Sequence, residues 1–410
     1  MIHHLERPAG PPPAWRRMLA DLGPGYAANG LIGFIFAATG PVAIILAVGT
    51  RGGLSEAELA SWVFGVFFIN GLLTLAMSWR YRMPLGFAWT IPGTVLVGPA
   101  LQHLSFAEVI GAFYATSALV LAMGLSGWVK RFMQALPMPI VMGMVAGVFL
   151  RFGLDIVRAL HSDVAIAAPM VLAFLALSAA PALGRRLPPV IGALLAGVLA
   201  IALLGRMESA ALASFTLAQP VVQAPAWSVA ALVELVIPLA ITVLVVQNGQ
   251  GIAVLKNAGH EPPTNTIAVA CGVGAAFSAM VGAVSSCLTG PTNALLTSSG
   301  ERARHYTAAL SFGLVAVLFG LMAPTFTGLM LAAPPEFIMV LGGVAMLRVL
   351  QGAFVASFSG RFTLGALVSL LVTVADLSLL NIGAAFWGLI AGVVVSWAME
   401  RGDFVAAARS

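Results

Sequence analysis

The sequence predicts an all-α polytopic membrane protein, and three observations lead to this prediction. Hydrophobic residues make up 60% of the 410 positions and charged residues only 9%, whereas a soluble domain has about 25% charged residues. The apolar residues form continuous runs of roughly 20, the length at which a helix crosses the hydrocarbon core. The runs do not alternate as β-barrel strands do, so helices are expected to satisfy the backbone inside the bilayer.

The apolar runs divide into fourteen expected membrane segments, in two sets of seven. The first set covers residues 25–50, 58–79, 84–103, 106–128, 135–157, 164–183 and 188–205. The second set covers residues 229–256, 264–281, 283–299, 306–331, 335–355, 362–380 and 382–399. Segments 3 and 10 are short, and Gly and Pro interrupt both near their starts.

The distribution of basic residues orients these segments, because cytoplasmic loops are enriched in Lys and Arg. If the N-terminus is cytoplasmic, 16 of the 20 basic residues fall inside, and only Arg51, Arg151, Arg158 and Arg206 fall outside. Both termini are therefore expected in the cytoplasm, with the protein in the cell (inner) membrane among its lipids. Because the basic residues lie at helix ends, the net charge of +5 does not indicate nucleic acid as a partner.

Seven segments per half predict an inverted repeat, since an odd repeat unit inserts its second copy upside down, as in many secondary transporters. Thr-x-Pro recurs at Thr90–Pro92 and Thr289–Pro291, in segments 3 and 10. Trp15 to Leu19 is either a short interfacial helix or part of a tail. The expected organisation is a cytoplasmic N-terminal segment (1–24), the first repeat (25–206), an external linker (207–228), the second repeat (229–400) and a cytoplasmic tail (401–410).

Segments 3 and 10 are expected to be broken half-helices. Proline suits the first turn of a helix and forces the preceding residue toward extended geometry. Phe87 to Ile91 should therefore be extended, with a helix starting near Pro92, and Ser285 to Gly290 should be extended, with a helix starting at Pro291. Two facing helix N-termini at mid-membrane would form a site for an anion or a strong hydrogen-bond acceptor.

The candidate substrate-binding residues lie at these breaks and in segments 1 and 8. Hydroxyls in membrane helices often bond their own backbone, Trp89 could be an ordinary packing residue, and the amides of segment 8 could join helices. These alternatives stand beside the binding-site interpretation. The candidates are Thr39, Phe87, Trp89, Thr90, Gln247, Gln250, Ser285, Ser286, Thr289 and Asn293.

Four ionisable residues inside the segments are also functional candidates: Arg151, Asp155, Glu234 and Asp376. Each lies near a segment end, so snorkelling to the interface is the simpler explanation, and Arg151 and Asp155 have the spacing to pair on one helix face. The sequence contains no GxxxxGK[ST], HExxH or CxxC motif. No enzyme activity, cofactor or metal is therefore expected.

The run from Gln247 to Pro263, QNGQGIAVLKNAGHEPP, resembles the benzoate/proton symporter (BenE) family, and Pro139 to Gly153 is similar to that family's fifth span. The resemblance implies the uracil-permease-like fold, with a core domain of spans 1–4 and 8–11 and a gate domain of the other spans. It also implies uptake of an aromatic carboxylate with a proton, and homodimers in some relatives. Residues 282–287 depart from the family by lacking a histidine, so we expect the proton to travel with the substrate.

Other functions remain open at this point. A nucleobase permease of the same fold would resemble its relatives in carrying carboxylates on spans 8 and 10, where this chain has Gln247 and Pro291-Thr292. Sulfate-type anion transporters usually append a cytoplasmic regulatory domain, for which the tail after Glu400 is too short. A passive channel is a further alternative, which saturable uptake against a gradient would separate from a transporter.

Overall fold

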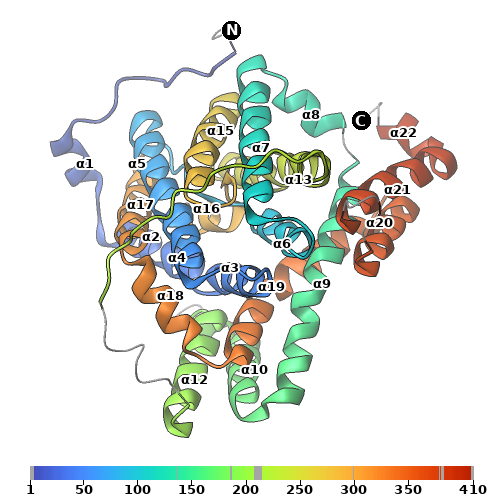
Figure 1. The fold of residues 1–410 in the computed structure, drawn as a ribbon. Coiled ribbons are helices and arrows are strands. Elements are labelled where there is room, and N and C mark those ends of the chain that lie inside the picture. Colours follow the sequence, from blue (N-terminus) through green and yellow to red (C-terminus); the bar gives the residue numbers. More distant parts are fainter. Residues whose placement is uncertain are drawn as a thin grey trace.

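The computed structural model describes residues 4–135, 137–184, 187–206, 215–298, 300–377, 379 and 383–407, and these residues are mostly helical (Figure 1). The elements from the first half are α1 (Trp15–Asp21), α2 (Pro24–Ala38), α3 (Gly40–Arg51), α4 (Glu56–Phe64), η1 (Gly65–Ile69), α5 (Asn70–Tyr81), β1 (Phe87–Trp89), α6 (Ile91–Ala100), α7 (Phe106–Ser126), α8 (Val129–Ala135), α9 (Met138–Ser162), α10 (Val164–Ala179), α11 (Pro181–Gly184) and α12 (Pro189–Leu204). The elements from the second half are α13 (Val229–Ile241), η3 (Thr242–Gln247), α14 (Asn248–Asn257), α15 (Thr264–Met280), β2 (Ser286–Leu288), α16 (Gly290–Leu296), η4 (Arg302–Arg304), α17 (His305–Leu321), α18 (Ala323–Leu331), α19 (Pro335–Phe358), α20 (Thr363–Ala375), α21 (Ala384–Met399) and α22 (Arg401–Ala407).

Each of the fourteen predicted segments contains a helix. Within the described ranges, seven helical stretches are long and apolar enough to cross a membrane. Six further apolar helices have 10–17 residues, among them α6. The protein is therefore a multi-pass membrane protein, and the span count of fourteen stays a prediction.

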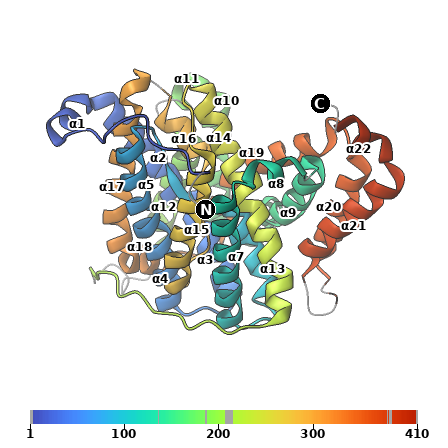
Figure 2. The same ribbon diagram turned by 90° about the horizontal axis from the view of Figure 1, so that it is seen from above.

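The helices pack into two groups (Figures 1 and 2). The larger helix group contains α2–α7 and α13–α18, with α7 against α15 and α17 against α2 and α5. The smaller helix group contains α9, α10, α12, α19, α20 and α21, with α9 against α19 and α20. The groups touch where α3 meets α19, α6 meets α9, and α13 meets α21. A contact surface thus runs between the two groups.

Two short strands pair inside the larger helix group, and this pair with its flanking residues is called the strand crossing below. β1 pairs antiparallel with β2, in the register Phe87 to Leu288, Ala88 to Cys287 and Trp89 to Ser286. Helix α6 follows β1 directly and α16 follows β2. The predictions of extended segments, with helices starting near Pro92 and Pro291, are therefore confirmed. The sequence did not predict that the two extended segments pair with each other.

Three irregularities in the long spans were not predicted. Segment 1 breaks at Thr39, whose φ of −91° and ψ of −95° separate α2 from α3. Pro41 follows this break in the first turn of α3, where it costs no hydrogen bond. Segments 2 and 8 contain the π-helical stretches η1 and η3, a geometry found frequently at functional sites.

The N-terminal segment and residues 215–228 lie against the larger helix group. Trp15 to Leu19 belongs to the helix α1, and its position at a membrane interface stays a prediction. Earlier in the chain, the Glu6 carboxylate accepts bonds of 3.0–3.1 Å from the N–H groups of Asn265 and Thr266 at the start of α15. Residues 215–228 run along the ends of α17, α15 and α7, at the lower edge of Figure 2.

Candidate functional site

Asn293 of α16 joins the two broken segments. Its Oδ1 accepts a hydrogen bond of 2.9 Å from the N–H of Gly86, and its Nδ2 donates to the carbonyl oxygens of Gly86 (2.9 Å) and Thr289 (2.6 Å). The side chain is completely buried. Its amide therefore fixes the chain before β1 to the start of α16, and in this conformation it is occupied by backbone.

Thr90 fixes the start of α6 to a neighbouring segment through its hydroxyl. Its hydroxyl accepts a hydrogen bond of 3.1 Å from the N–H of Gly93, which caps the helix, and donates at 2.9 Å to the Thr242 hydroxyl of η3. Thr242 in turn donates to the carbonyl of Leu239. This chain of bonds positions the N-terminus of α6 against the π-helical part of segment 8.

Three polar side chains at the crossing lack a partner. The hydroxyls of Ser285 and Ser286 and the indole N–H of Trp89 are buried and have no hydrogen-bond partner in the described part of the chain. A buried polar group without a partner costs about 1–3 kcal/mol. Such atoms in a native structure suggest a site that a ligand or water completes.

The aromatic candidates lie on one face of the strand pair. Trp89 meets Phe67 of η1 edge to face, with ring centroids 5.0 Å apart, and Phe67 in turn packs on Phe319 of α17. Phe87 is completely buried. Trp89 thus belongs to an aromatic cluster in this conformation, as its packing interpretation proposes, while its indole N–H remains unpaired.

The amides of segment 8 have different environments. The Oδ1 of Asn248 accepts a hydrogen bond of 2.7 Å from the N–H of Leu288, which attaches the end of η3 to β2. Gln247 precedes it as the last residue of η3 and is buried. Gln250 is largely exposed and its side chain lies beside Gly290 at the start of α16. These two contacts join segment 8 to segment 10, and the Thr242–Thr90 bond described above joins it to segment 3.

Thr39 and Thr289 are the two remaining candidates. Thr39 donates its hydroxyl to the carbonyls of Ile35 (2.9 Å) and Phe36 (3.2 Å) in its own helix, the self-bonding alternative for hydroxyls. It lines an apolar cavity of about 380 Å³ between the two helix groups. Thr289 is buried at the N-cap of α16.

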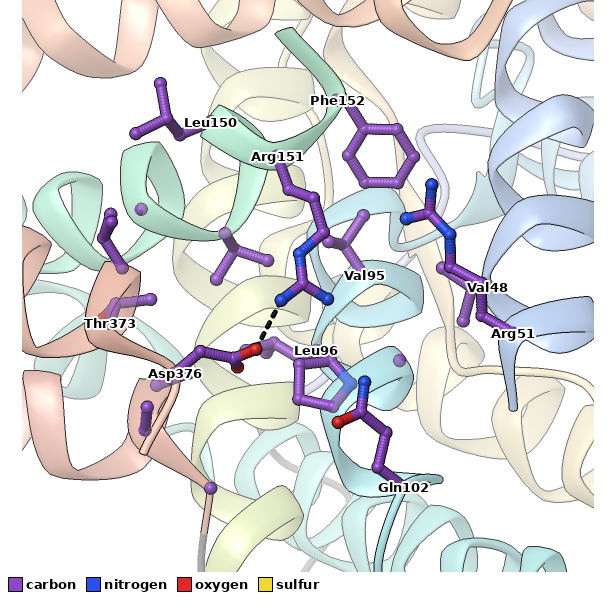
Figure 3. A pocket seen from close by; sticks show the side chains of 18 of the residues that line it. Val48, Arg51, Val95, Leu96, Gln102, Leu150, Arg151, Phe152, Thr373 and Asp376 are labelled. Atoms are coloured by element: carbon purple, nitrogen blue, oxygen red, sulfur yellow. Dashed lines mark hydrogen bonds and ion pairs between the residues drawn. The ribbon is translucent and has the colours of Figure 1, made fainter. Parts of the chain in front are cut away.

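A cavity of about 190 Å³ opens between the helix groups, away from the strand crossing (Figure 3). It is bounded by α3, the C-terminal half of α6, α9, α13, and the ends of α20 and α21 that face each other. None of the ten candidate residues lines it. Its polar lining consists of Arg51, Gln102, Arg151, Arg158, Glu234, Thr373 and Asp376.

The arginines beside this cavity are paired with acids. Arg51 bonds Asp155 at 2.6 Å, connecting α3 of the larger group to α9 of the smaller group, and Arg158 bonds the same carboxylate at 3.0 Å. Arg151 pairs with Asp376, as Figure 3 shows. The expected pairing of Arg151 with Asp155 is therefore wrong. Snorkelling is wrong for Asp155 and Glu234, which are 2% and 5% exposed, because protein partners cover both carboxylates.

Removing the charge of Asp155 is expected to destabilise the protein. The Asp155→Asn variant leaves two guanidiniums facing a neutral amide, and breaking a fully buried pair costs about 3–5 kcal/mol. Because Arg51 and Arg158 are 40% and 61% exposed, we expect a smaller loss of unfolding free energy, about 1–3 kcal/mol. Thermal unfolding in detergent measures it. Asp376→Asn, whose pair is exposed on both sides, should lose clearly less; equal losses would contradict the prediction.

Sequence reasoning missed the partner of Glu234. His103, in the turn after α6, places its Nε2 2.9 Å from the Oε2 of Glu234 in α13. The two residues are 131 positions apart in the chain. The only signal in the sequence was an acidic residue inside an apolar segment, which indicated Glu234 but not its partner His103.

A second imidazole contact joins the loop after segment 8 to the first residue of α17. The Nε2 of His260 is 3.1 Å from the Nδ1 of His305. Burial, followed by the nearby His305 and Arg302, lowers the pKa of His260 to about 4. His260 is therefore neutral at physiological pH, and neither histidine lines the cavity of Figure 3.

A bundle of apolar helices in which two broken segments cross is the architecture of a membrane transporter. Fold comparison agrees with this class. The structure matches the transmembrane domain of the cyanobacterial bicarbonate transporter BicA with a TM-score of 0.60 and 17% identity, over 93% of this chain and 99% of that one. It matches SLC26A9 with a TM-score of 0.62 and 14% identity, over 90% of this chain, and spans only 64% of that longer chain.

The chain belongs to the BenE family, described as benzoate membrane transport protein, whose family model matches residues 20–398. It is 32% identical to the inner membrane protein YdcO of Escherichia coli, over 89% of this chain and 92% of that protein. It is 26% identical to the benzoate membrane transport protein of Acinetobacter baylyi, with the same coverage. The protein is thus a membrane transporter and not an enzyme.

Proposed function

We propose that the protein imports benzoate or a related aromatic carboxylate together with a proton, by alternating access. The observation that carries this proposal is the family match over residues 20–398, together with a relative named for benzoate transport. The fold likeness to BicA and SLC26A9 supports transport by the same architecture. No carboxylate or histidine stands among the ten candidate residues, so the substrate itself is one possible carrier of the proton.

The proposed substrate site is the strand crossing. The substrate carboxylate would take hydrogen bonds from the Ser285 and Ser286 hydroxyls, which are buried without partners, beside the N-terminus of α6, where a helix favours negative charge. The aromatic ring would lie against Phe87 or Trp89. In this assignment Thr90 and Asn293 hold the backbone of the site in place, since their polar atoms are already bonded.

The proposed architecture is fourteen spans in two inverted repeats. The larger helix group corresponds to the core domain, which carries the substrate site, and the smaller group to the gate domain. Alternating access then consists of movement of the larger group against the smaller one. Contacts between the groups, such as Arg51 to Asp155, must change during this movement.

The proposed orientation gives a labelling prediction. Ala303 is exposed in η4, between Arg302 and Arg304, and belongs to the expected cytoplasmic side. In whole cells, Ala303→Cys should resist an impermeant thiol reagent until the membrane is permeabilised. Val222→Cys, in the expected external linker and 72% exposed, is the positive control. Labelling at position 303 in intact cells would contradict the proposed orientation. The native Cys271 and Cys287 are buried and should contribute little background labelling.

Uptake into proteoliposomes tests the function. We expect saturable accumulation of labelled benzoate when the pH outside is lower than inside, and loss of accumulation when an ionophore removes the gradient. Unlabelled aromatic carboxylates should compete, whereas uracil and bicarbonate should not. Competition by uracil and not by aromatic carboxylates would overturn the proposed substrate class. Benzoate accumulation that is the same with and without the pH gradient would overturn proton coupling.

A further inference from the structure

His103 and Glu234 form a buried acid–base pair that the proposed substrate site does not use. The carboxylate is 5% exposed and the imidazole side chain 20% exposed, and their facing atoms are 2.9 Å apart. Glu234 also lines the cavity of Figure 3. A titratable pair inside a membrane segment is expensive to maintain and marks functional sites in transporters.

Glu234 also lies where the two helix groups meet. The backbone amide of Gly383, the N-cap residue of α21, donates toward the Glu234 carboxylate. A Cβ at position 383 would lie only 2.4 Å from the Oε1 of Glu234, so the approach depends on glycine. The carboxylate from the larger group thus caps a helix of the smaller group, where the helix dipole favours its negative charge.

Other charged groups near the pair are already engaged. Glu108 of α7 acts on His103 at longer range and is bonded to Ser105. The cavity wall contributes Arg51 from α3, Arg151 and Arg158 from α9, and Asp376 at the end of α20, and these residues are paired with acids or, for Asp376, with Arg151. The other ion pairs at the cavity each contain an arginine, which stays protonated, so His103–Glu234 is the pair there in which both partners can gain or lose a proton.

We propose that His103 and Glu234 form the proton-binding site through which a pH gradient moves the two helix groups relative to each other. This inference rests on the proposed proton-coupled uptake and assigns the proton to the protein instead of the substrate. Arg51, Arg151 and Arg158 at the cavity belong to the expected external set, so the cavity opens to the outside in the proposed orientation.

Before the proton binds, the Glu234 carboxylate accepts the Gly383 amide and contacts the His103 imidazole. A proton delivered by hydronium through the cavity converts this carboxylate into a carboxyl and leaves water behind. The neutral carboxyl is a weaker acceptor for the Gly383 amide than the carboxylate. Its protonation therefore loosens the contact between α13 and α21, and the proton's release on the other side of the membrane restores that contact.

The test measures two rates in proteoliposomes: benzoate accumulation driven by a pH gradient, and benzoate exchange at equal pH. We expect Glu234→Gln to lower the ratio of accumulation to exchange at least tenfold, and His103→Gln to lower it severalfold. Glu261→Gln and His161→Gln make the same chemical changes at exposed positions and should leave the ratio unchanged. Infrared difference spectra between high and low pH should contain a carboxyl C=O band that Glu234→Gln removes.

The outcomes separate this inference from the proposed function. If the wild-type protein exchanges benzoate but a pH gradient drives no accumulation, the proposed proton coupling fails, and this inference fails with it. If the wild type accumulates benzoate and both variants keep its ratio, the proton travels elsewhere and only this inference fails. Should Glu234→Gln not fold, the ratio of His103→Gln decides the test in the same way.

Discussion

Replacing Gln247 by glutamate is expected to abolish benzoate uptake at neutral pH. Gln247 is buried at the end of η3, and the neighbouring Asn248 attaches this point to β2 of the proposed substrate site. In a site of effective dielectric constant ~20, two like charges ~4 Å apart repel by about 4 kcal/mol. Since about 1.4 kcal/mol is tenfold in affinity, Gln247→Glu should weaken binding of a carboxylate about a thousandfold.

The pH dependence of this variant identifies the cause. Lowering the pH protonates the introduced carboxylate and removes the repulsion, so uptake should partly recover, whereas a misfolded protein would not recover. Gln247→Ala should be milder, because it loses one hydrogen bond of roughly 1–3 kcal/mol. Initial rates of labelled benzoate uptake between neutral and acidic pH measure both variants. Wild-type rates in Gln247→Glu at neutral pH would remove Gln247 from the site.

The second large effect is expected at Gly40, which packs against α19 of the smaller helix group directly after the Thr39 break. A Cβ at position 40 would lie 2.0 Å from the Cβ of Ala345 in α19. The Gly40→Ala variant must therefore push α3 and α19 apart, and such overpacking costs about 1–3 kcal/mol. A change of this size shifts a conformational equilibrium by about 5–150-fold, so we expect transport to slow by about fivefold or more.

A compensating substitution tests the steric argument for Gly40. Ala345→Gly removes the methyl group that the new side chain meets, so the double variant Gly40→Ala/Ala345→Gly should regain most of the wild-type uptake rate. Gly352→Ala, also in α19 but with no atom within 4 Å of the added Cβ, should transport normally. A double variant as slow as Gly40→Ala alone would show that the defect is not steric.

Local sequence chemistry was sufficient to predict the broken segments. Proline fixes its own conformation and restricts the residue before it, so Pro92 and Pro291 indicated both the extended stretches and the starts of α6 and α16. Apolar run length likewise predicted where the helices lie, because a helix needs only its own residues to satisfy its backbone.

Features that depend on distant partners were not predictable in this way. The pairing of β1 with β2, the Asn293 clamp and the His103–Glu234 pair all join residues far apart in the chain. The π-helical stretch η3 has no marker among the apolar residues of segment 8. Asp155 near a segment end suggested snorkelling because its partner Arg51 lies 104 positions earlier.

The strand pairing at the centre of the larger helix group has a consequence for biosynthesis. Strand β1 satisfies its backbone with β2, and Gly86 depends on Asn293, 207 positions later in the chain. When the first half leaves the ribosome and enters the bilayer, Thr74 can already bond the backbone of Phe87, but the N–H groups of Gly86 and Thr90 lack their partners Asn293 and Ser285, and unbonded backbone is costly in lipid. Gly86 and Thr90 therefore need water or an insertion factor as a temporary partner, and the proposed substrate site is completed only after the second half has been inserted.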